Sequence, residues 1–328
     1  MNSQRIVVGG ASGYLGSRLV SALTADGWEV VTVGRGTANA NWDDPAAIRT
    51  LVDGAAAVIG LSGKSVDCRY TDANRNEILR SRVETTRALS DAIAASASPP
   101  PVWLNASTTT IYRHATDHPQ TERDGELGSG FSVDVAREWE RTCTAAELPH
   151  TRRVLLRTSI VLGDGPATRL LFRLARLGIG GPQFDGRWFP HRRYRGIGST
   201  PSEPTPPGWH RTRGRQRFSW VHIDDFIGAV RFALANDALS GPINVASPGV
   251  SDNRTLMRIL RRTVGALLGI PAFRWMLEPA AWALRTESEM VLKSRWARPE
   301  ALLAAGYEFQ WPELEPALRD IDAGMRRS

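Results

Sequence analysis

The stretch GGASGYLG, Gly9 to Gly16, follows the apolar run Ile6–Val8 and carries glycines at a GxxGxxG spacing. In such a loop Gly10 permits a tight turn, Gly13 lets the backbone approach a pyrophosphate, and Gly16 lets the next helix pack on the strand. The N-terminus of that helix offers N–H groups and the positive end of its dipole to phosphates. Because the loop follows a strand and opens a helix, the stretch predicts dinucleotide binding at the start of a βαβ unit.

An arginine just after the second apolar run indicates which dinucleotide is bound. Val30–Val33 is followed by Gly34 and Arg35. Sites that prefer NAD carry an acid about 20 residues past the loop, where it holds the ribose 2′-hydroxyl, whereas an arginine accommodates a 2′-phosphate. Arg35 therefore predicts NADP(H), against the alternative of an ordinary solvated arginine.

Apolar runs alternate with helical patterns through the first half of the chain. We expect strands at Ile6–Val8, Val30–Val33, Ala56–Leu61, Val102–Ala106 and Val154–Val161, and helices at Ser17–Asp26, Ala73–Ala95 and Val133–Ala146. Strands that alternate with helices predict an α/β fold with a doubly wound, parallel, Rossmann-like sheet.

The second half is less regular. We expect strands at Phe218–His222 and Ile243–Val245 around a helix at Asp225–Asn236. An amphipathic helix is predicted by the spacing of five apolar residues, namely Leu256, Ile259, Leu260, Val264 and Leu267. Shorter helices and Trp-rich turns should follow Pro271.

The composition is that of a soluble globular chain: of 328 residues, 42% are hydrophobic and 23% charged. No signal peptide and no run of eighteen apolar residues is found, so no membrane span is expected. The two cysteines, Cys68 and Cys143, are far apart, which fits a reducing cytoplasm. The six histidines show no ligand spacing, so we predict no metal site.

The positive charge is carried almost entirely by arginine. The net charge is +7, and of 41 lysines and arginines only Lys64 and Lys293 are lysines, so 39 are arginines. Guanidinium groups bind phosphate and carboxylate in bidentate fashion, so the bias suits recognition of an anion. It equally suits a GC-rich genome.

Together these features resemble the extended and atypical short-chain dehydrogenase/reductases, and more narrowly the NAD-dependent epimerase-like proteins called "epimerase family protein" or cell-division-inhibitor homologues. The resemblance runs nearly end to end. It rests on the glycine loop and on the stretches Asn41–Asp43, Leu61–Gly63, Ser81–Arg82 with Thr85, Ser107–Tyr112, Phe131, Trp139–Glu140, Leu156–Gly163, Phe218–Asp225, Gly241–Val245 and Leu302–Phe309.

The resemblance implies a Rossmann-like cofactor domain and a smaller C-terminal substrate lobe. We accordingly predict an NADP-binding domain at 1–165, to which 218–247 return, a basic Arg/Trp/Pro-rich insertion over the cleft at 166–217, and the lobe at 248–328. The resemblance supplies no substrate.

Typical short-chain reductases use Tyr-x-x-x-Lys, in which the tyrosine exchanges the carbonyl proton and the lysine holds the nicotinamide ribose. No YxxxK occurs in this chain. Phe131 and Val135 stand where the resemblance places the pair, and neither has a proton to transfer or a group to bind a ribose. The sequence therefore predicts that the usual acid/base pair is missing.

Other side chains are candidates for the chemistry. Ser107, Thr108 and Thr109 follow the fourth strand at its carboxyl end, where sites form in such sheets, and Tyr112 is the first candidate acid. The alternatives are a turn-capping Ser107 and a packing Tyr112. His222 is a further acid/base candidate, against the alternative of a structural histidine.

The candidate cofactor-binding residues lie at the glycine loop and at the ends of the next strands. They are Gly10, Ser12, Gly13, Tyr14, Leu15, Gly16, Arg35, Leu61, Gly63, Arg82, Ala106 and Arg157. For Arg82 and Arg157, a role in steadying the fold remains equally open. Asp224 and Asp225 are expected to cap the helix that they precede.

The insertion is the main departure from the resemblance. Arginines and tryptophans from Arg187 to Arg195 and from Trp209 to Arg217 flank a low-complexity centre, Ser199–Gly208. We expect a lid whose guanidinium forks and indole faces contact an anionic or aromatic substrate, or else a solvated loop.

Three kinds of function follow from these observations. The first is an NADP(H)-dependent oxidoreductase or epimerase acting on a small molecule. The second is a non-redox cyclase, isomerase or dehydratase, which the missing Tyr/Lys pair favours. The third is a non-catalytic NADPH-binding or RNA-binding protein, although a nucleic-acid partner is disfavoured. A homodimer is left open.

Overall fold

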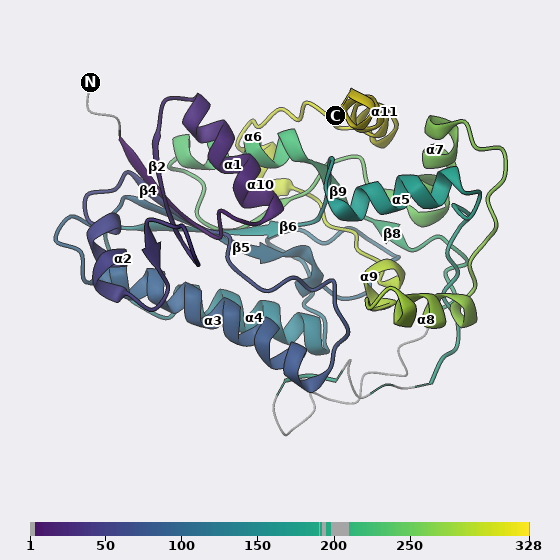
Figure 1. Cartoon of the computed structure of the whole chain (residues 1–328), viewed down its shortest axis with the longest axis horizontal. Helices are drawn as coiled ribbons and strands as arrows, with labels where there is room; N and C mark the ends of the chain where they lie inside the picture. Colours follow the sequence, from purple (N-terminus) through teal and green to yellow (C-terminus); the bar gives the residue numbers. More distant parts are fainter. Residues whose placement is uncertain (1–3, 190, 192–194, 198–209, 328) are drawn as a thin grey trace.

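The computed structural model describes residues 4–189, 191, 195–197 and 210–327. Its core is a parallel sheet of seven strands in the order β10-β6-β5-β4-β1-β2-β3 (Figure 1). These strands are β1 (Arg5–Gly9), β2 (Glu29–Gly34), β3 (Ala40–Asn41), β4 (Ala57–Gly60), β5 (Val102–Thr108), β6 (Arg152–Thr158) and β10 (Gly241–Val245). Every residue of β4 is buried, as expected of a parallel strand that is covered on both faces.

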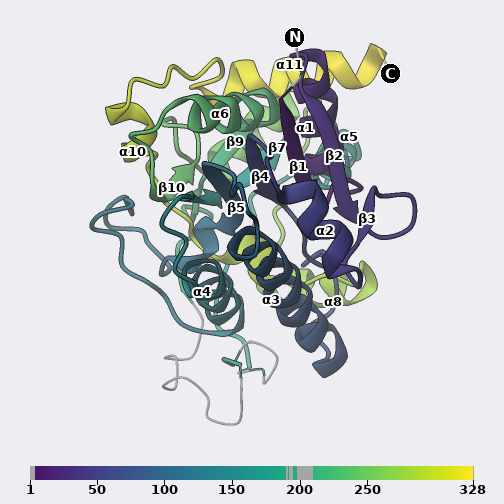
Figure 2. The same ribbon diagram turned by 90° about the vertical axis from the view of Figure 1, so that its left-hand side faces the viewer.

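Helices cover both faces of this sheet (Figure 2). One layer consists of α1 (Tyr14–Ala25), α6 (Ile223–Ala235) and α10 (Glu300–Ala304), and the other of α2 (Pro45–Val52), α3 (Asp72–Ala94) and α4 (Phe131–Thr144). Leu19 of α1 and Phe226 of α6 belong to one apolar core, whereas Ile48 of α2 and Leu89 of α3 belong to a second core on the opposite face. The predicted doubly wound α/β fold is confirmed.

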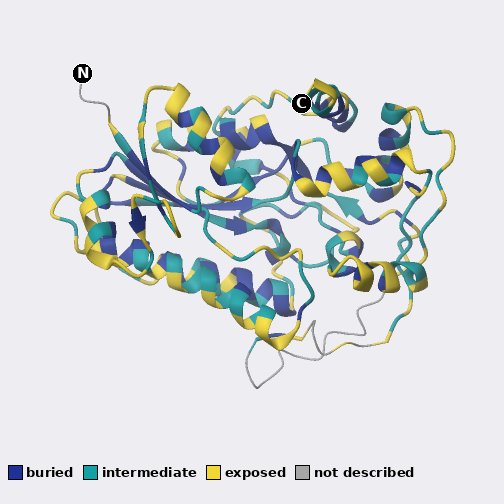
Figure 3. Cartoon of the chain, in the orientation of Figure 1, coloured by how far each residue is buried: buried dark blue, intermediate teal, exposed yellow. Residues whose placement is uncertain are grey.

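The remaining elements lie beside the sheet, and several of them enclose a third apolar core. The helices are α5 (Pro166–Arg176), α7 (Asn253–Val264), α8 (Arg274–Ala283), α9 (Glu289–Leu292) and α11 (Leu314–Arg327), and the strands are β7 (Ile160–Leu162), β8 (Arg217–Phe218), β9 (Trp220–His222) and β11 (Ser251–Asp252). Phe172, Leu260 and Leu318 bring α5, α7 and α11 into one core. Figure 3 shows the buried faces of these helices turned inward and their exposed faces turned outward.

Two of the predicted strands are each divided in the structure. The strand predicted at Val154–Val161 leaves the central sheet at Ser159, whose N–H and hydroxyl both donate to the Val245 carbonyl oxygen at 3.1 Å. Its continuation, β7, pairs with β9 in a separate two-stranded sheet. The strand predicted at Phe218–His222 is likewise divided at Ser219, because the Ser219 N–H donates to the Arg295 carbonyl oxygen at 3.1 Å.

One helix is shorter than predicted. α7 ends at Val264, and Gly265 follows with a left-handed backbone, φ 72°, as its C-cap. Leu267, which we placed on the buried face of this helix, therefore lies beyond its end and is 98% exposed. Among the described helices, none is both long and apolar enough to cross a membrane.

Candidate cofactor-binding and active site

The glycine loop connects β1 to α1, and its three glycines meet different surroundings. Gly10 has φ +86°, and a Cβ there would lie 2.8 Å from the Leu61 carbonyl carbon and from the Ser62 nitrogen. A Cβ on Gly16 would collide with the Gly10 carbonyl oxygen. A Cβ on Gly13 would touch only that same oxygen, at 3.5 Å, so the fold itself does not require glycine there. Glycine at this position instead leaves the N-terminus of α1 open to an approaching group.

Tyr14, the first residue of α1, is anchored to the segment between β7 and α5. Its hydroxyl donates to Asp164 Oδ1 at 3.0 Å, and Arg18 forms an ion pair with the same carboxylate. A Cβ on Gly163 would collide with the Tyr14 hydroxyl and one on Gly165 would press against its ring, so these two glycines make room for the side chain. Burial and the Asp164 carboxylate raise the pKa of Tyr14, which makes its hydroxyl a structural donor.

Arg35 lies directly after β2 and is exposed. Its side chain forms no hydrogen bond or ion pair within the described part of the chain. The loop that carries it is closed by Asn39, whose Oδ1 accepts from the Thr32 N–H at 2.8 Å. The loop therefore presents a guanidinium without an internal partner beside the glycine loop.

The connection after β4 is held by α3. Ser81 Oγ accepts from the Lys64 N–H at 2.9 Å, and Arg82 Nη1 donates to the Lys64 carbonyl oxygen at 3.0 Å. The Arg82 guanidinium lies over the Trp139 ring at 4.9 Å, and burial lowers its pKa to about 10. These contacts fix the backbone of Lys64, directly after Leu61–Gly63, and a direct role of Arg82 toward a cofactor stays a prediction.

The predicted residues are brought together along one edge of the sheet. β2, β1, β4 and β5 are consecutive neighbours and parallel, so the residues after their carboxyl ends share one edge. From β2 to β5 that edge carries Arg35, the glycine loop, Leu61–Gly63 and then Thr108, with Ala106 half-buried in β5. Ligands in doubly wound sheets bind at this edge.

Phe131 and Val135 are core residues of the first turns of α4. They are 2% and 5% exposed, and Phe131 packs edge-on against the Tyr70 ring at 4.9 Å. The Arg75 guanidinium lies over the Phe131 ring, 4.3 Å from its centre. Neither Phe131 nor Val135 offers a group for proton transfer.

A buried network around Glu140 takes up three of the predicted site residues. Ser107 Oγ donates to Glu140 Oε1 at 2.5 Å, and Arg157 donates to both Glu140 oxygens through Nε and Nη2, each at 2.8 Å. Arg157 Nη1 donates to the Tyr112 hydroxyl at 2.9 Å, and that hydroxyl donates to Asn244 Oδ1 at 2.9 Å. Tyr112 is 3% exposed, and burial raises its pKa.

This network gives these three residues a structural role inside the protein, and their predicted roles toward a ligand stay predictions. The Tyr112 hydroxyl, the Ser107 hydroxyl and the Arg157 guanidinium are each hydrogen-bonded inside the protein, where they join β5, α4 and β6. Thr108 differs because it is half-buried at the end of β5, where its Oγ1 accepts from the Thr110 N–H at 3.1 Å. It remains a candidate.

His222 is the N-cap of α6 and is 2% exposed. Its Nδ1 accepts from the Asp224 N–H at 3.2 Å, so the cap is the histidine and not one of the two following acids. Asp225 instead accepts from the Gln310 and Trp311 N–H groups at 2.7 and 2.9 Å. The geometry therefore favours a structural His222 over an acid/base.

Asp320 completes a group with His222 and Asp224 whose potential ligand atoms lie within 4.8 Å of one another. Since Nδ1 accepts a hydrogen bond, the neutral ring carries its proton on Nε2, which lies 3.6 Å from Asp320 Oδ2. That tautomer leaves no ring lone pair for a metal ion, so the group supports no metal site.

Two cations that the sequence analysis did not select lie at the end of β5. Lys293 Nζ donates to the Thr110 carbonyl oxygen at 2.7 Å, and Arg295 Nε donates to Thr110 Oγ1 at 3.2 Å. Burial lowers the pKa of Lys293 to about 8. One signal was present in the sequence: Lys293 is one of only two lysines among 41 cationic side chains.

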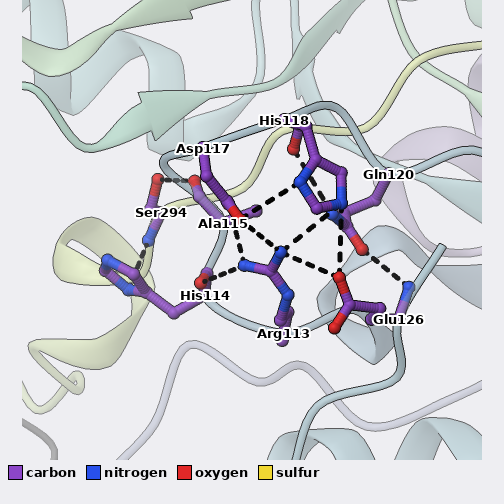
Figure 4. Close-up of polar contacts among 8 residues, drawn as sticks. All are labelled: Arg113, His114, Ala115, Asp117, His118, Gln120, Glu126 and Ser294. Carbon is purple, nitrogen blue, oxygen red and sulfur yellow. Dashed lines mark hydrogen bonds and ion pairs between the residues drawn. The ribbon is translucent and has the colours of Figure 1, made fainter.

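The segment that carries Lys293 is fastened to the loop after Tyr112 (Figure 4). Ser294 donates from its N–H to His114 Nδ1 at 3.1 Å and from its hydroxyl to the Ala115 carbonyl oxygen at 2.5 Å. Arg113 binds Asp117 and Glu126 within the same loop, at 2.8 and 2.9 Å. Lys293 is thus held in place by its neighbour in the chain.

Within the basic insertion, the structure describes residues 166–189, 191, 195–197 and 210–217. Arg75 Nη2 donates to the Gly196 carbonyl oxygen at 2.9 Å, and Asp134 Oδ2 accepts from the Ile197 N–H at 3.1 Å, so residues 196–197 contact α3 and α4. The His210 ring stacks on His114 with their centres 3.5 Å apart. The centre, Ser199–Gly208, and the predicted lid residues Arg192, Arg193 and Trp209 lie outside the described residues.

Two family models match the chain. That of the NAD dependent epimerase/dehydratase family matches residues 6–246, and that of a domain of unknown function, DUF1731, matches residues 274–321. The first match contains the central sheet from β1 to β10 and the glycine loop.

Relatives align over nearly the whole length. The epimerase family protein SDR39U1 of Bos taurus is 31% identical over 97% of this chain and 100% of its own, and the epimerase family protein YfhF of Bacillus subtilis is 26% identical over 98% and 99%. The crystal structure of human epimerase family protein SDR39U1 with NADPH is similar with a TM-score of 0.80, at 27% identity over 98% of this chain and 99% of that one.

Proposed function

Because the chain belongs to the NAD dependent epimerase/dehydratase family, we propose that it is an NADP(H)-dependent oxidoreductase or epimerase of a small molecule. The open glycine loop carries this proposal: Gly13 meets an ordinary contact where Gly10 and Gly16 meet close backbone. A phosphate approaching the N-terminus of α1 explains why glycine occupies a position that the fold does not restrict.

The dinucleotide is proposed to lie along the carboxyl edge of the sheet. With its adenosine ribose at Arg35 after β2 and its phosphates at the loop after β1, the rest of the molecule must extend away from β2. The next strands in that direction are β4 and β5. The nicotinamide would then reach the region of Thr108.

NADP(H) is proposed over NAD(H) because Arg35 is an exposed cation without an internal partner. A 2′-phosphate gives it a charge-assisted partner that the 2′-hydroxyl of NAD lacks. The human relative was crystallised with NADPH, which supports the same choice.

Titration of the chain with NADPH and NADH, followed by nucleotide fluorescence, tests this choice. We expect Arg35→Ala to weaken NADPH binding about 10- to 100-fold, as expected for a lost hydrogen bond between charged groups. NADH binding should change less than about threefold. The control is Arg141→Ala on α4, which removes an exposed arginine elsewhere. A wild-type preference for NADH would refute the assignment.

The fate of the cofactor distinguishes the two redox reactions. An epimerase oxidises and reduces the same substrate, so it retains its cofactor unchanged over many turnovers. A reductase consumes NADPH, and the absorbance of the reduced nicotinamide falls with each turnover.

A second candidate is a non-redox rearrangement such as a cyclisation, isomerisation or dehydration. The observation that favours it is the pair Phe131 and Val135, which are buried and carry no acid/base group. In that case the chain binds NADPH but neither consumes nor transiently oxidises it. Exchange of a deuteride label from the cofactor into product separates the two, because only hydride transfer moves the label.

A further inference from the structure

Lys293 lies where the proposed nicotinamide end of the cofactor meets the second half of the chain. Its Nζ donates to the carbonyl oxygen of Thr110, two residues past the end of β5, at 2.7 Å. It also lines a narrow cavity with Arg295, Ile160, Gln216, Phe218 and Asn253. An ammonium has three donors, so the bond to Thr110 leaves two for other partners.

The choice of lysine at this position is informative in this chain. Arginine supplies 39 of its 41 lysine and arginine side chains, so lysine occurs at only two positions. Arginine is never deprotonated in proteins, whereas lysine changes its protonation readily when it is buried. A requirement for a proton that can leave explains a lysine here, whereas a requirement for charge alone does not.

Three charged or titratable groups face Lys293. Glu289 lies on α9, Arg295 follows two residues later in the chain, and His114 belongs to the loop after Tyr112. Burial lowers the pKa of Lys293 to about 8, Glu289 opposes this shift, and Arg295 adds to it. Within the described residues Lys293 has no carboxylate at ion-pair distance, so its ammonium is not fixed in the charged state by a partner.

We propose that Lys293 is the proton donor of this site. The proposal rests on the proposed function: as hydride passes from NADPH to the carbonyl carbon of the substrate, one N–H bond of the Lys293 ammonium breaks and its proton forms the O–H bond of the alcohol. The products are NADP⁺, the alcohol and a neutral amine, which regains a proton from water. In the reverse direction the neutral amine takes the hydroxyl proton.

The scarcity of lysine makes the protonation of Lys293 directly measurable. Reductive methylation with ¹³C-formaldehyde labels only Lys64, Lys293 and the N-terminal amine, and the variants Lys64→Arg and Lys293→Arg assign the signals. We expect the Lys293 signal to titrate with a midpoint near 8 and to shift when NADPH is added. A midpoint above about 10, the ordinary value for lysine, would overturn the proposal.

The catalytic arm uses NADPH with 4-nitrobenzaldehyde and 9,10-phenanthrenequinone as carbonyl probes. Lys293→Arg and Lys293→Met should each lower kcat by about 10²- to 10⁴-fold, the usual contribution of a general acid, with the NADPH dissociation constant within about threefold of wild type. Arginine keeps the positive charge but does not release a proton. A lower kcat in Lys293→Arg therefore shows that the proton, and not only the charge, is needed. The wild-type profile of kcat should fall above pH 8, and thermal unfolding checks that both variants fold.

The activity measurements distinguish failure of the Lys293 proposal from failure of the proposed redox function. If the wild-type chain reduces a probe and Lys293→Arg reduces it equally well, only the role of Lys293 is refuted. If the wild-type chain binds NADPH but reduces neither probe, the proposed redox function fails and the donor role falls with it.

Discussion

Gly13 and Gly16 lie one helical turn apart and differ in the space beside their Cα atoms. Gly16→Ala should destabilise the chain by about 2 kcal/mol or more, because its methyl group would meet the Gly10 carbonyl oxygen, and backbone relaxes poorly. Gly13→Ala should cost about 1 kcal/mol or less, the ordinary difference between glycine and alanine at an N-cap. Urea unfolding of the two variants measures both values.

The affinity for NADPH should fall in Gly13→Ala, although this variant is expected to lose little stability. Gly13→Ala places a methyl group where the phosphates approach, so we expect at least a tenfold weaker affinity in a protein that still folds, about 1.4 kcal/mol. Equal NADPH affinity in wild type and Gly13→Ala would show that the loop holds no phosphate.

Individual site residues were predictable where a local pattern fixes their place. The glycines and Arg35 follow strands that the sequence marks clearly, so their positions at the carboxyl edge could be foreseen. Lys293 could not, because it lies 183 residues from its partner Thr110 and no local pattern links them. The internal partners of Tyr112 could not be foreseen for a related reason: Arg157 and Asn244 come from distant strands.

At the scale of elements, α4 is joined to β5 and β6 by the Glu140 carboxylate. Glu140→Gln removes the charge from a buried pair and leaves the Arg157 guanidinium, 8% exposed, without its carboxylate. We expect a loss of about 2 to 4 kcal/mol, because an unpaired buried charge costs more than the pair contributed. Chemical denaturation measures it.

Glu138→Gln is the matched control for this prediction. Glu138 lies on the same helix and pairs with Arg141, whose side chain is 68% exposed. A pair so open to solvent contributes at most about 1 kcal/mol. Equal losses in the two variants would mean that burial does not set the strength of the Glu140 network.

Elements were predictable when both faces of a strand or one face of a helix were apolar. Every end of β1, β2, β4 and β5 lies within two residues of the predicted range, because buried parallel strands form continuous apolar runs. The division at Ser159 was not predictable, since the apolar run continues through β7 while the hydrogen bonds change partner. Tertiary pairing, not local pattern, decides where such a strand ends.

At the scale of the whole molecule, the two halves of the chain meet at the end of β5. The loop after Tyr112 comes from the sheet half and Ser294 from the C-terminal half, and they are joined through His114 and Ala115 (Figure 4). The proposed nicotinamide position and Lys293 lie at this junction. Conditions that weaken the contacts of Ser294 with His114 and Ala115 should therefore lower the stability of the fold and disturb the proposed site together.

His114 makes this junction sensitive to acid. Its Nδ1 accepts the Ser294 N–H, and burial, assisted by the stacked His210 ring and by neighbouring cations, lowers its pKa to about 3. The unfolded chain binds a proton at this histidine below about pH 6.5, whereas the folded chain does not until the pH nears 3. The stability is therefore complete above about pH 6.5 and is lost as the pH falls toward 3.

We expect the free energy of unfolding to be about 1 to 2 kcal/mol lower at pH 5 than at pH 7, from this group alone. His114→Gln should remove most of that dependence, because the amide does not titrate, whereas His150→Gln, which replaces an exposed histidine before β6, should retain it. Urea unfolding at pH 7, 6 and 5 measures the slope for all three proteins. If His114→Gln and His150→Gln have the same slope as wild type, the acid sensitivity does not arise at the junction, because burial of the His114 ring then favours neither protonation state.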